Sequence, residues 1–204
     1  MREELRAGIA IYNEGYYHAA HDAWEDRWLD LESGTSDERL LHGLIQFTAA
    51  VYHARNRNWE GAVGLATSGF EYLEPLPSPY RGVGLESIRE YLGGLAGDPD
   101  LIDRRSPPAI THGGECLAFD DLDVTEIGIA AAILAEELGY DLEPIELARS
   151  YARIDLDAGR DDSRFIAMLF DFAREESDRD IVYQRLVGHV DRRRTREDDV
   201  SGLF

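Results

Sequence analysis

The stretch YNEGYYHAAHDAWEDRW, residues 12–28, holds two of the six histidines and two of the three tryptophans of the chain. It opens with a helix stop at Gly15, a residue that accepts the left-handed conformation at low cost. On a helix that starts just after this stop, His21 and Glu25 are four residues apart and Trp28 follows three later. The three side chains then fall within a stripe roughly 60° wide, so an imidazole and a carboxylate lie side by side on an apolar surface. This is the best candidate for a chemical site that the sequence offers.

Outward from this stretch, the hydrophobic periodicity predicts an all-α protein built from antiparallel helical hairpins. A capping box at Thr35-x-x-Glu38 starts the helix that follows. No strand pattern is convincing, and residues 98–122 are predicted to be irregular. The bundle of about seven to eight helices covers residues 2–13, 16–31, 36–57, 58–74, 84–95, 124–138, 144–157 and 162–195, the last broken near Ser177. We expect residues 1–97 to form a core helical domain and residues 98–204 an additional helical region packed on it.

The predicted helix over 36–57 is apolar nearly all round between residues 40 and 52, which is typical of a buried central helix. Its polar exceptions His42, Gln46 and His53 project within roughly 40° of one another. Buried polar groups need partners. We therefore expect the stripe that carries His21 to face the one that carries Gln46 and His53.

The composition is strongly acidic. The net charge is −20 and the pI is near 4.5, and all 21 basic residues are Arg. Acidic residues spread along the whole chain, together with the absence of Lys, are typical of an archaeal-type halophilic protein. In concentrated salt, the repulsion between carboxylates is screened within about 3 Å at 1 M. An acidic protein with a basic partner is the alternative interpretation.

The same composition argues against several classes of partner. Nucleic acid is disfavoured because phosphate contacts need basic patches. The one basic cluster, residues 192–196, closes a predicted helix and is interpreted as a solvated helix end. A single cysteine, Cys116, excludes a disulfide framework. No apolar run reaches 18 residues and no leader precedes the first helix, so we expect a cytoplasmic protein without a membrane segment.

The chain resembles the domain of unknown function 309 family, small helical proteins of bacteria and archaea. The resemblance covers about residues 3–95 and departs from the family at His18 and His42, where the family usually has Glu and Gln. The matching blocks are Tyr12-Asn13-x-Gly15-x-Tyr17, Ala20-His21-x-x-x-Glu25-x-x-Trp28, Gly43-Leu44-Ile45-Gln46 with Ala49-Ala50 and Tyr52-His53, and Asn58-x-x-Gly61-Ala62.

A metal site is what the resemblance implies for the first helical hairpin, because the family's H-x-x-x-E-x-x-[WY] motif has been suggested to bind metal. The motif maps onto His21, Glu25 and Trp28 here. His53 could supply a third ligand across the helix interface, with His18 and Gln46 beside it. An open coordination position would then suit Zn²⁺ or Mn²⁺ of the hydrolytic kind.

Two interpretations of function stay open. In the first, which the sequence favours slightly, the protein is a non-enzymatic interaction or scaffold protein, with a protein partner or a second copy of itself, and the His21/Glu25 pair is structural. Exposed apolar or aromatic residues on the first or fourth helix would support it. In the second, the protein is a metal-dependent hydrolase-type enzyme that uses His21 and Glu25 as ligands. The substrate is not indicated by the sequence.

Overall fold

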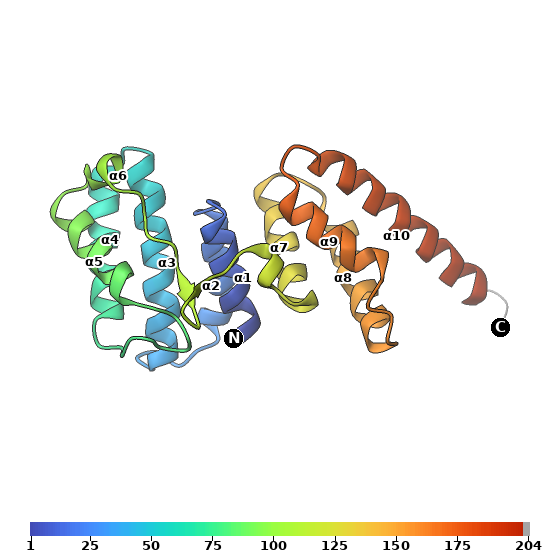
Figure 1. Ribbon diagram of the computed structural model, residues 1–204, viewed down its shortest axis with the longest axis horizontal. Helices are drawn as coiled ribbons and strands as arrows, with labels where there is room; N and C mark the ends of the chain where they lie inside the picture. The colour runs from blue at the N-terminus through green and yellow to red at the C-terminus, as the bar shows by residue number, and fades with distance from the viewer. Residues whose placement is uncertain (202–204) are drawn as a thin grey trace. The chain divides into compact units, whose positions relative to one another are not determined.

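The computed structural model describes the backbone of residues 1–201 and the side chains of residues 1–199. The all-α fold is confirmed: ten α-helices lie within this described part, with one small sheet. The chain divides into two compact units, one from Met1 to Asp121 and one that begins at Leu122. Figure 1 shows the helices of each unit.

The first unit consists of six helices in which each helix from α1 to α4 packs on the next along the chain. This is the arrangement that a series of helical hairpins produces. In Figure 1, α3 is flanked by α4, which in turn packs on α5. The helices are α1 (Arg2–Asn13), α2 (Ala19–Leu29), α3 (Ser36–Arg55), α4 (Trp59–Leu73), α5 (Glu86–Gly97) and the single turn α6 (Leu101–Arg104).

Local sequence signals fix the ends of the first four helices. Gly15 follows α1 with φ +93°, as the predicted stop requires. The hydroxyl of Thr35 accepts the Glu38 N–H at the start of α3, and the Asn58 side chain accepts the Gly61 N–H at the start of α4. However, α2 begins at Ala19 and not at residue 16, because residues 17–18 form a turn.

The α1–α2 contact is set by one glycine and one tryptophan. Trp24 is fully buried, and its indole N–H donates to the Leu5 carbonyl at 3.3 Å. A Cβ added at Gly8 would lie 2.3 Å from the Trp24 Nε1. The close packing of the two helices therefore requires glycine at this position.

Residues 98–121 belong to the first unit, although the sequence analysis grouped residues 98–204 together. They contain a small antiparallel hairpin, β1 (Thr111–His112) and β2 (Glu115–Cys116), and the 3₁₀ turn η1 (Phe119–Asp121). Gly113 and Gly114, with φ +66° and +88°, form the two-residue turn between the strands. The sequence shows no convincing strand pattern here because strands of two residues are too short to produce an alternation. That residues 98–204 pack on the core stays a prediction.

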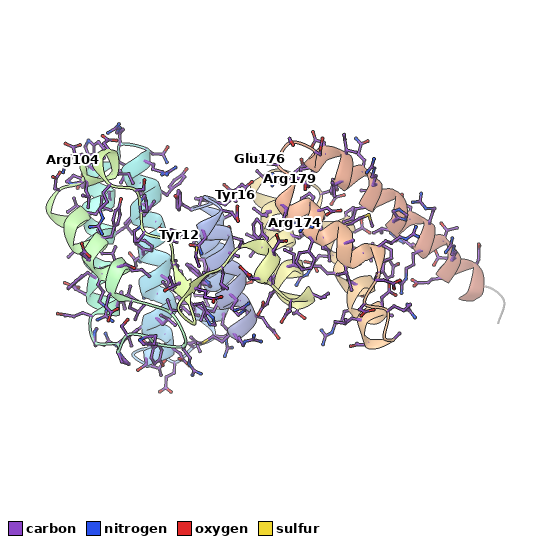
Figure 2. The ribbon with its side chains drawn as sticks, viewed as in Figure 1. Tyr12, Tyr16, Arg104, Arg174, Glu176 and Arg179 are labelled. Carbon is purple, nitrogen blue, oxygen red and sulfur yellow. The ribbon has the colours of Figure 1, made fainter. Side chains whose placement is uncertain are left out.

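The second unit contains α7 (Val124–Glu137), α8 (Leu142–Asp157), α9 (Arg164–Arg174) and α10 (Arg179–Ser201). The predicted break near Ser177 separates α9 from α10. Arg179, labelled in Figure 2, is buried and donates to the carbonyls of Phe172 and Ala173. Its guanidinium thereby satisfies carbonyl groups at the C-terminal end of α9. Within the described residues, no helix has the length and apolar character needed to cross a bilayer.

Candidate functional site

The histidines of α2 and α3 gather at two places in the first unit. His42 lies in a half-buried network with Trp28, Glu38 and Gln46. The other histidines line a small open pocket at the opposite end of the α2–α3 contact. The first place is a hydrogen-bonded network, whereas the second is a pocket.

Glu38 is the centre of the first network. Its side chain is only 8% exposed. Its Oε1 accepts from the Trp28 indole N–H at 3.0 Å and from the His42 Nδ1 at 3.2 Å, and its Oε2 accepts from the Gly34 N–H at 3.2 Å. The Gln46 amide lies 3.2 Å from the His42 Nε2, to which it can donate. Both ring nitrogens of a neutral His42 thus have a suitable partner, with Nδ1 donating to Glu38 and Nε2 accepting from Gln46.

The pKa of Glu38 shows that these contacts outweigh its burial. Burial raises the pKa of the carboxyl, but the hydrogen bonds from Trp28, Gly34 and His42 lower it more, and the result lies below the ordinary value. Glu38 is therefore a charged anchor that fixes the α2–α3 connection. The network has the structural role that the sequence analysis gave to His21 and Glu25.

The second place is a pocket of about 200 Å³ between α2 and α3. Ala49 is the one aliphatic residue of its lining, and the other lining residues are aromatic. The ring of His18 lies 5.0 Å from the ring of His21 and 5.0 Å from that of Tyr52. The lining residues are Tyr17, His18, His21, Ala49, Tyr52 and His53.

His21 is held in one orientation by its neighbours. Its Nδ1 contacts the carbonyl oxygen of His18, which can only accept, so the hydrogen of a neutral ring lies on Nδ1. The Nε2 lies 3.1 Å from the Asp22 Oδ1, and a neutral ring would then point a lone pair at a carboxylate. Such a contact is favourable only if a proton or a cation lies between the two atoms.

His18 completes a group of three ligand atoms with His21 and Asp22. The three atoms lie within 4.8 Å of one another. Among the side chains described, through residue 199, no other set of three His, Cys, Asp or Glu residues is as closely grouped. His18 and Asp22 are separated by four residues, so they share a face at the start of α2. Two imidazoles and a carboxylate are a donor set that transition-metal ions use in proteins.

His53 faces the same pocket, but its hydrogen-bond partner assigns it a different role. Asn58 caps α4 with its side-chain oxygen, so its NH₂ group faces the His53 Nδ1 at 2.6 Å. The Nδ1 must then accept, and the Nε2 carries the hydrogen. In this state His53 offers the pocket a hydrogen-bond donor and not a lone pair for a metal ion.

The structure brings together only some of the residues that the sequence singled out. His18, His21 and His53 share the pocket, whereas Trp28 and Gln46 belong to the Glu38 network. Glu25 is exposed on α2 and is not part of the group of three. Sequence reasoning missed Asp22. Its spacing of four residues from His18 was a usable signal.

Comparison with known families bears on the first unit. Residues 5–65 match the family described as Domain of unknown function (DUF309). This match lies within the first unit, which is similar to the family over these residues. The match includes most of α1, all of α2 and α3 and the first half of α4, and thus both the Glu38 network and the pocket. No curated protein matches the chain.

Proposed function

We propose that the DUF309 part of the chain is a metal-binding module, with His18, His21 and Asp22 as the protein ligands. The position of the His21 ring carries the proposal. Its Nε2 lies 3.1 Å from the Asp22 carboxylate, and its Nδ1 already contacts the His18 carbonyl. Two ligand atoms bound tetrahedrally at about 2.0–2.1 Å from Zn²⁺ lie about 3.3 Å apart. The contact between His21 and Asp22 therefore suits a shared ion.

A metal-free explanation of the same contact is a protonated His21 that donates to both oxygens. In that explanation His18 contributes its ring contacts with His21 and Tyr52. The metal proposal uses all three residues and leaves further coordination positions toward the pocket. We favour Zn²⁺, with Mn²⁺ as the alternative, because two imidazoles favour the later transition metals.

The pocket residues would then act on a small molecule beside the ion. A metal ion with an open position supplies Lewis-acid chemistry, which is the basis of a hydrolase-type activity. His53 would donate a hydrogen bond from Nε2, and the rings of Tyr17 and Tyr52 would limit the size of the molecule. This hydrolase-type activity depends on the proposed metal ion.

The interaction or scaffold alternative receives less support than the sequence gave it. Its expected sign was exposed apolar side chains on the first or fourth helix. Among the side chains described, none of the large exposed hydrophobic residues lies on α1 or α4. Leu29 on α2 and Tyr52 on α3 are exposed, at 67% and 41%. A second copy or protein partner on this face remains the alternative proposal.

Elemental analysis of protein purified without chelator or affinity metal tests the proposal. We expect about one ion per chain, lost in His21→Ala and in Asp22→Asn. Glu25→Gln is the matched control, because Glu25 belongs to the family motif but lies outside the group of three. A metal-free wild type would overturn the proposal. Loss of metal in Glu25→Gln with retention in Asp22→Asn would assign the ion to the motif residues instead.

A further inference from the structure

A cavity of about 910 Å³ lies within the second unit, between α8, α9 and α10. This is within the size range of small-molecule sites. Its lining is basic, in a chain whose net charge is −20. The basic lining residues are Arg160, Arg164, His189, Arg192, Arg193 and Arg196.

Two of these cations are neutralised inside the cavity wall. Arg160 and Arg193 both donate to Asp155, at 2.6 and 2.8 Å, and Arg193 also donates to Glu197 at 3.2 Å. Asp155 is buried and its carboxylate accepts a third bond from the Ser163 hydroxyl. These residues build a rigid wall and leave little charge for a ligand.

The guanidinium groups of the other three arginines are not neutralised in this way. Arg164 lies in the first turn of α9, and Arg192 and Arg196 are four residues apart on α10, so that they share one face. Within the side chains of residues 1–199, no carboxylate lies within ion-pair distance of any of the three. One further carboxylate, Asp162, lines the cavity. An excess of positive charge therefore remains on its lining.

The positive charges of Arg164 and Arg192 act on His189. Arg164 can donate to its Nδ1 at 3.4 Å, which leaves the Nε2 as a donor when the ring is neutral. Burial lowers the pKa of His189, and the nearby charges of Arg192 and Arg164 lower it further. Bound negative charge in the cavity would reverse the second effect.

We propose that this cavity is a binding site for a small phosphate-bearing anion. Guanidinium groups from two helices approach it from different directions, which suits the tetrahedral oxygens of a phosphate better than the planar pair of a carboxylate. Phe165 adds an apolar wall, over which the Arg193 guanidinium lies at 5.4 Å. The volume beyond a phosphate group leaves room for an organic part.

The cavity changes the interpretation of the basic cluster at residues 192–196. Arg194 does lie outward, where it pairs with Glu143 at 3.1 Å. Arg192 and Arg196 line the cavity instead, so the cluster is not only a solvated helix end. Three cations in one concave site suit a small ligand, whereas a nucleic acid would need a longer basic surface.

Isothermal titration calorimetry with inorganic pyrophosphate tests the proposal on the full-length protein. We expect saturable binding by the wild type, weakened about tenfold or more in an Arg192→Gln/Arg196→Gln double variant. Both side chains are exposed, so the variant should keep its fold. Arg185→Gln is the matched control, because Arg185 is exposed on α10 and does not line the cavity; its affinity should stay within about twofold.

An NMR titration of His189 gives an independent result. With saturating pyrophosphate, its pKa should rise in the wild type and stay unchanged in the double variant. Citrate in place of pyrophosphate separates phosphate recognition from a general preference for anions, and equal affinity for the two would refute the phosphate assignment. Absence of pyrophosphate binding, or equal binding by wild type and double variant, would overturn the site itself.

Discussion

Asp155 should carry a large, pH-dependent part of the stability of the second unit. Its side chain is 10% exposed and accepts from Ser163 at 2.6 Å, from Arg160 at 2.6 Å and from Arg193 at 2.8 Å. Burial raises the pKa of this carboxyl, but the three hydrogen bonds and the charge of Arg193 lower it to about 2, from an ordinary 3.8. The folded state therefore binds the proton less tightly than the unfolded chain does.

The magnitude and its sign follow from linkage. A pKa that is lower in the folded state stabilises the fold above the unfolded value and ceases to do so as the pH falls through the folded value. The difference of about 1.8 in pKa, at 1.36 kcal/mol each, gives about 2.4 kcal/mol at pH 7. The same relation leaves about 1.3 kcal/mol at pH 3 and about 0.4 kcal/mol at pH 2.

Asp155→Asn removes the charge at nearly constant volume. We expect it to lower the free energy of unfolding of the second unit by about 2.4 kcal/mol at pH 7, and by clearly less at pH 3. Urea titrations followed by the amide NMR signals of α9 would measure this unit separately from the first. Glu146→Gln is the control, because Glu146 is an exposed carboxylate on α8 that pairs with Arg149; it should cost under about 0.5 kcal/mol.

Two results would refute this reasoning. If Asp155→Asn costs the same at pH 7 and pH 3, the loss comes from packing and not from the charged carboxylate. If the cost at pH 7 is as small as that of Glu146→Gln, the three hydrogen bonds do not hold the ends of α8, α9 and α10 together in the way that the geometry indicates.

Three further predictions concern the first unit and the whole chain. Gly8→Ala should destabilise the first unit by about 1–3 kcal/mol, because the added Cβ would lie 2.3 Å from the buried Trp24. At Gly64 an added Cβ meets no neighbouring atom, so Gly64→Ala should stabilise the unit by up to about 1 kcal/mol. Urea unfolding followed by tryptophan fluorescence compares the two variants. Glu38→Gln should cost about 1–3 kcal/mol in the same assay, because its amide cannot accept from every donor around it, and a variant as stable as the wild type would contradict the anchor role. Lowering KCl from multimolar to about 0.1 M, where screening extends over about 10 Å, should unfold or weaken the protein, as circular dichroism would show, and unchanged stability would count against a halophilic origin.

The fold was largely predictable because its helix boundaries are set by local chemistry. The stop at Gly15 and the caps at Thr35 and Asn58 are local features, and periodicity supplied the helices between them. The start of α2 was not predictable in this way. Residues 16–18 are compatible with a helix by composition, and only the turn after α1 excludes them.

The candidate site was less predictable, because helical spacing shows which side chains share a face but not which neighbour that face meets. His21 and Glu25 do have the spacing of one stripe, yet Glu25 is exposed while His21 faces Asp22 and His18. The carboxylate that accepts a hydrogen bond from the half-buried His42 is Glu38, four residues earlier on the same helix. The capping-box pattern had assigned that carboxylate to the helix start.

The hydrogen-bond partners of each histidine show whether its role is structural or chemical, as a comparison of His42 with His21 illustrates. The contacts of His42 are complete: a carboxylate on one ring nitrogen and an amide on the other. At His21 the set is incomplete, because one ring nitrogen faces a carbonyl and the other faces a carboxylate. A satisfied ring stabilises packing, whereas a ring between two acceptors needs a proton or a metal cation between it and one of them. This difference, which the sequence does not contain, is the reason for proposing a metal site at His21 and a structural anchor at His42.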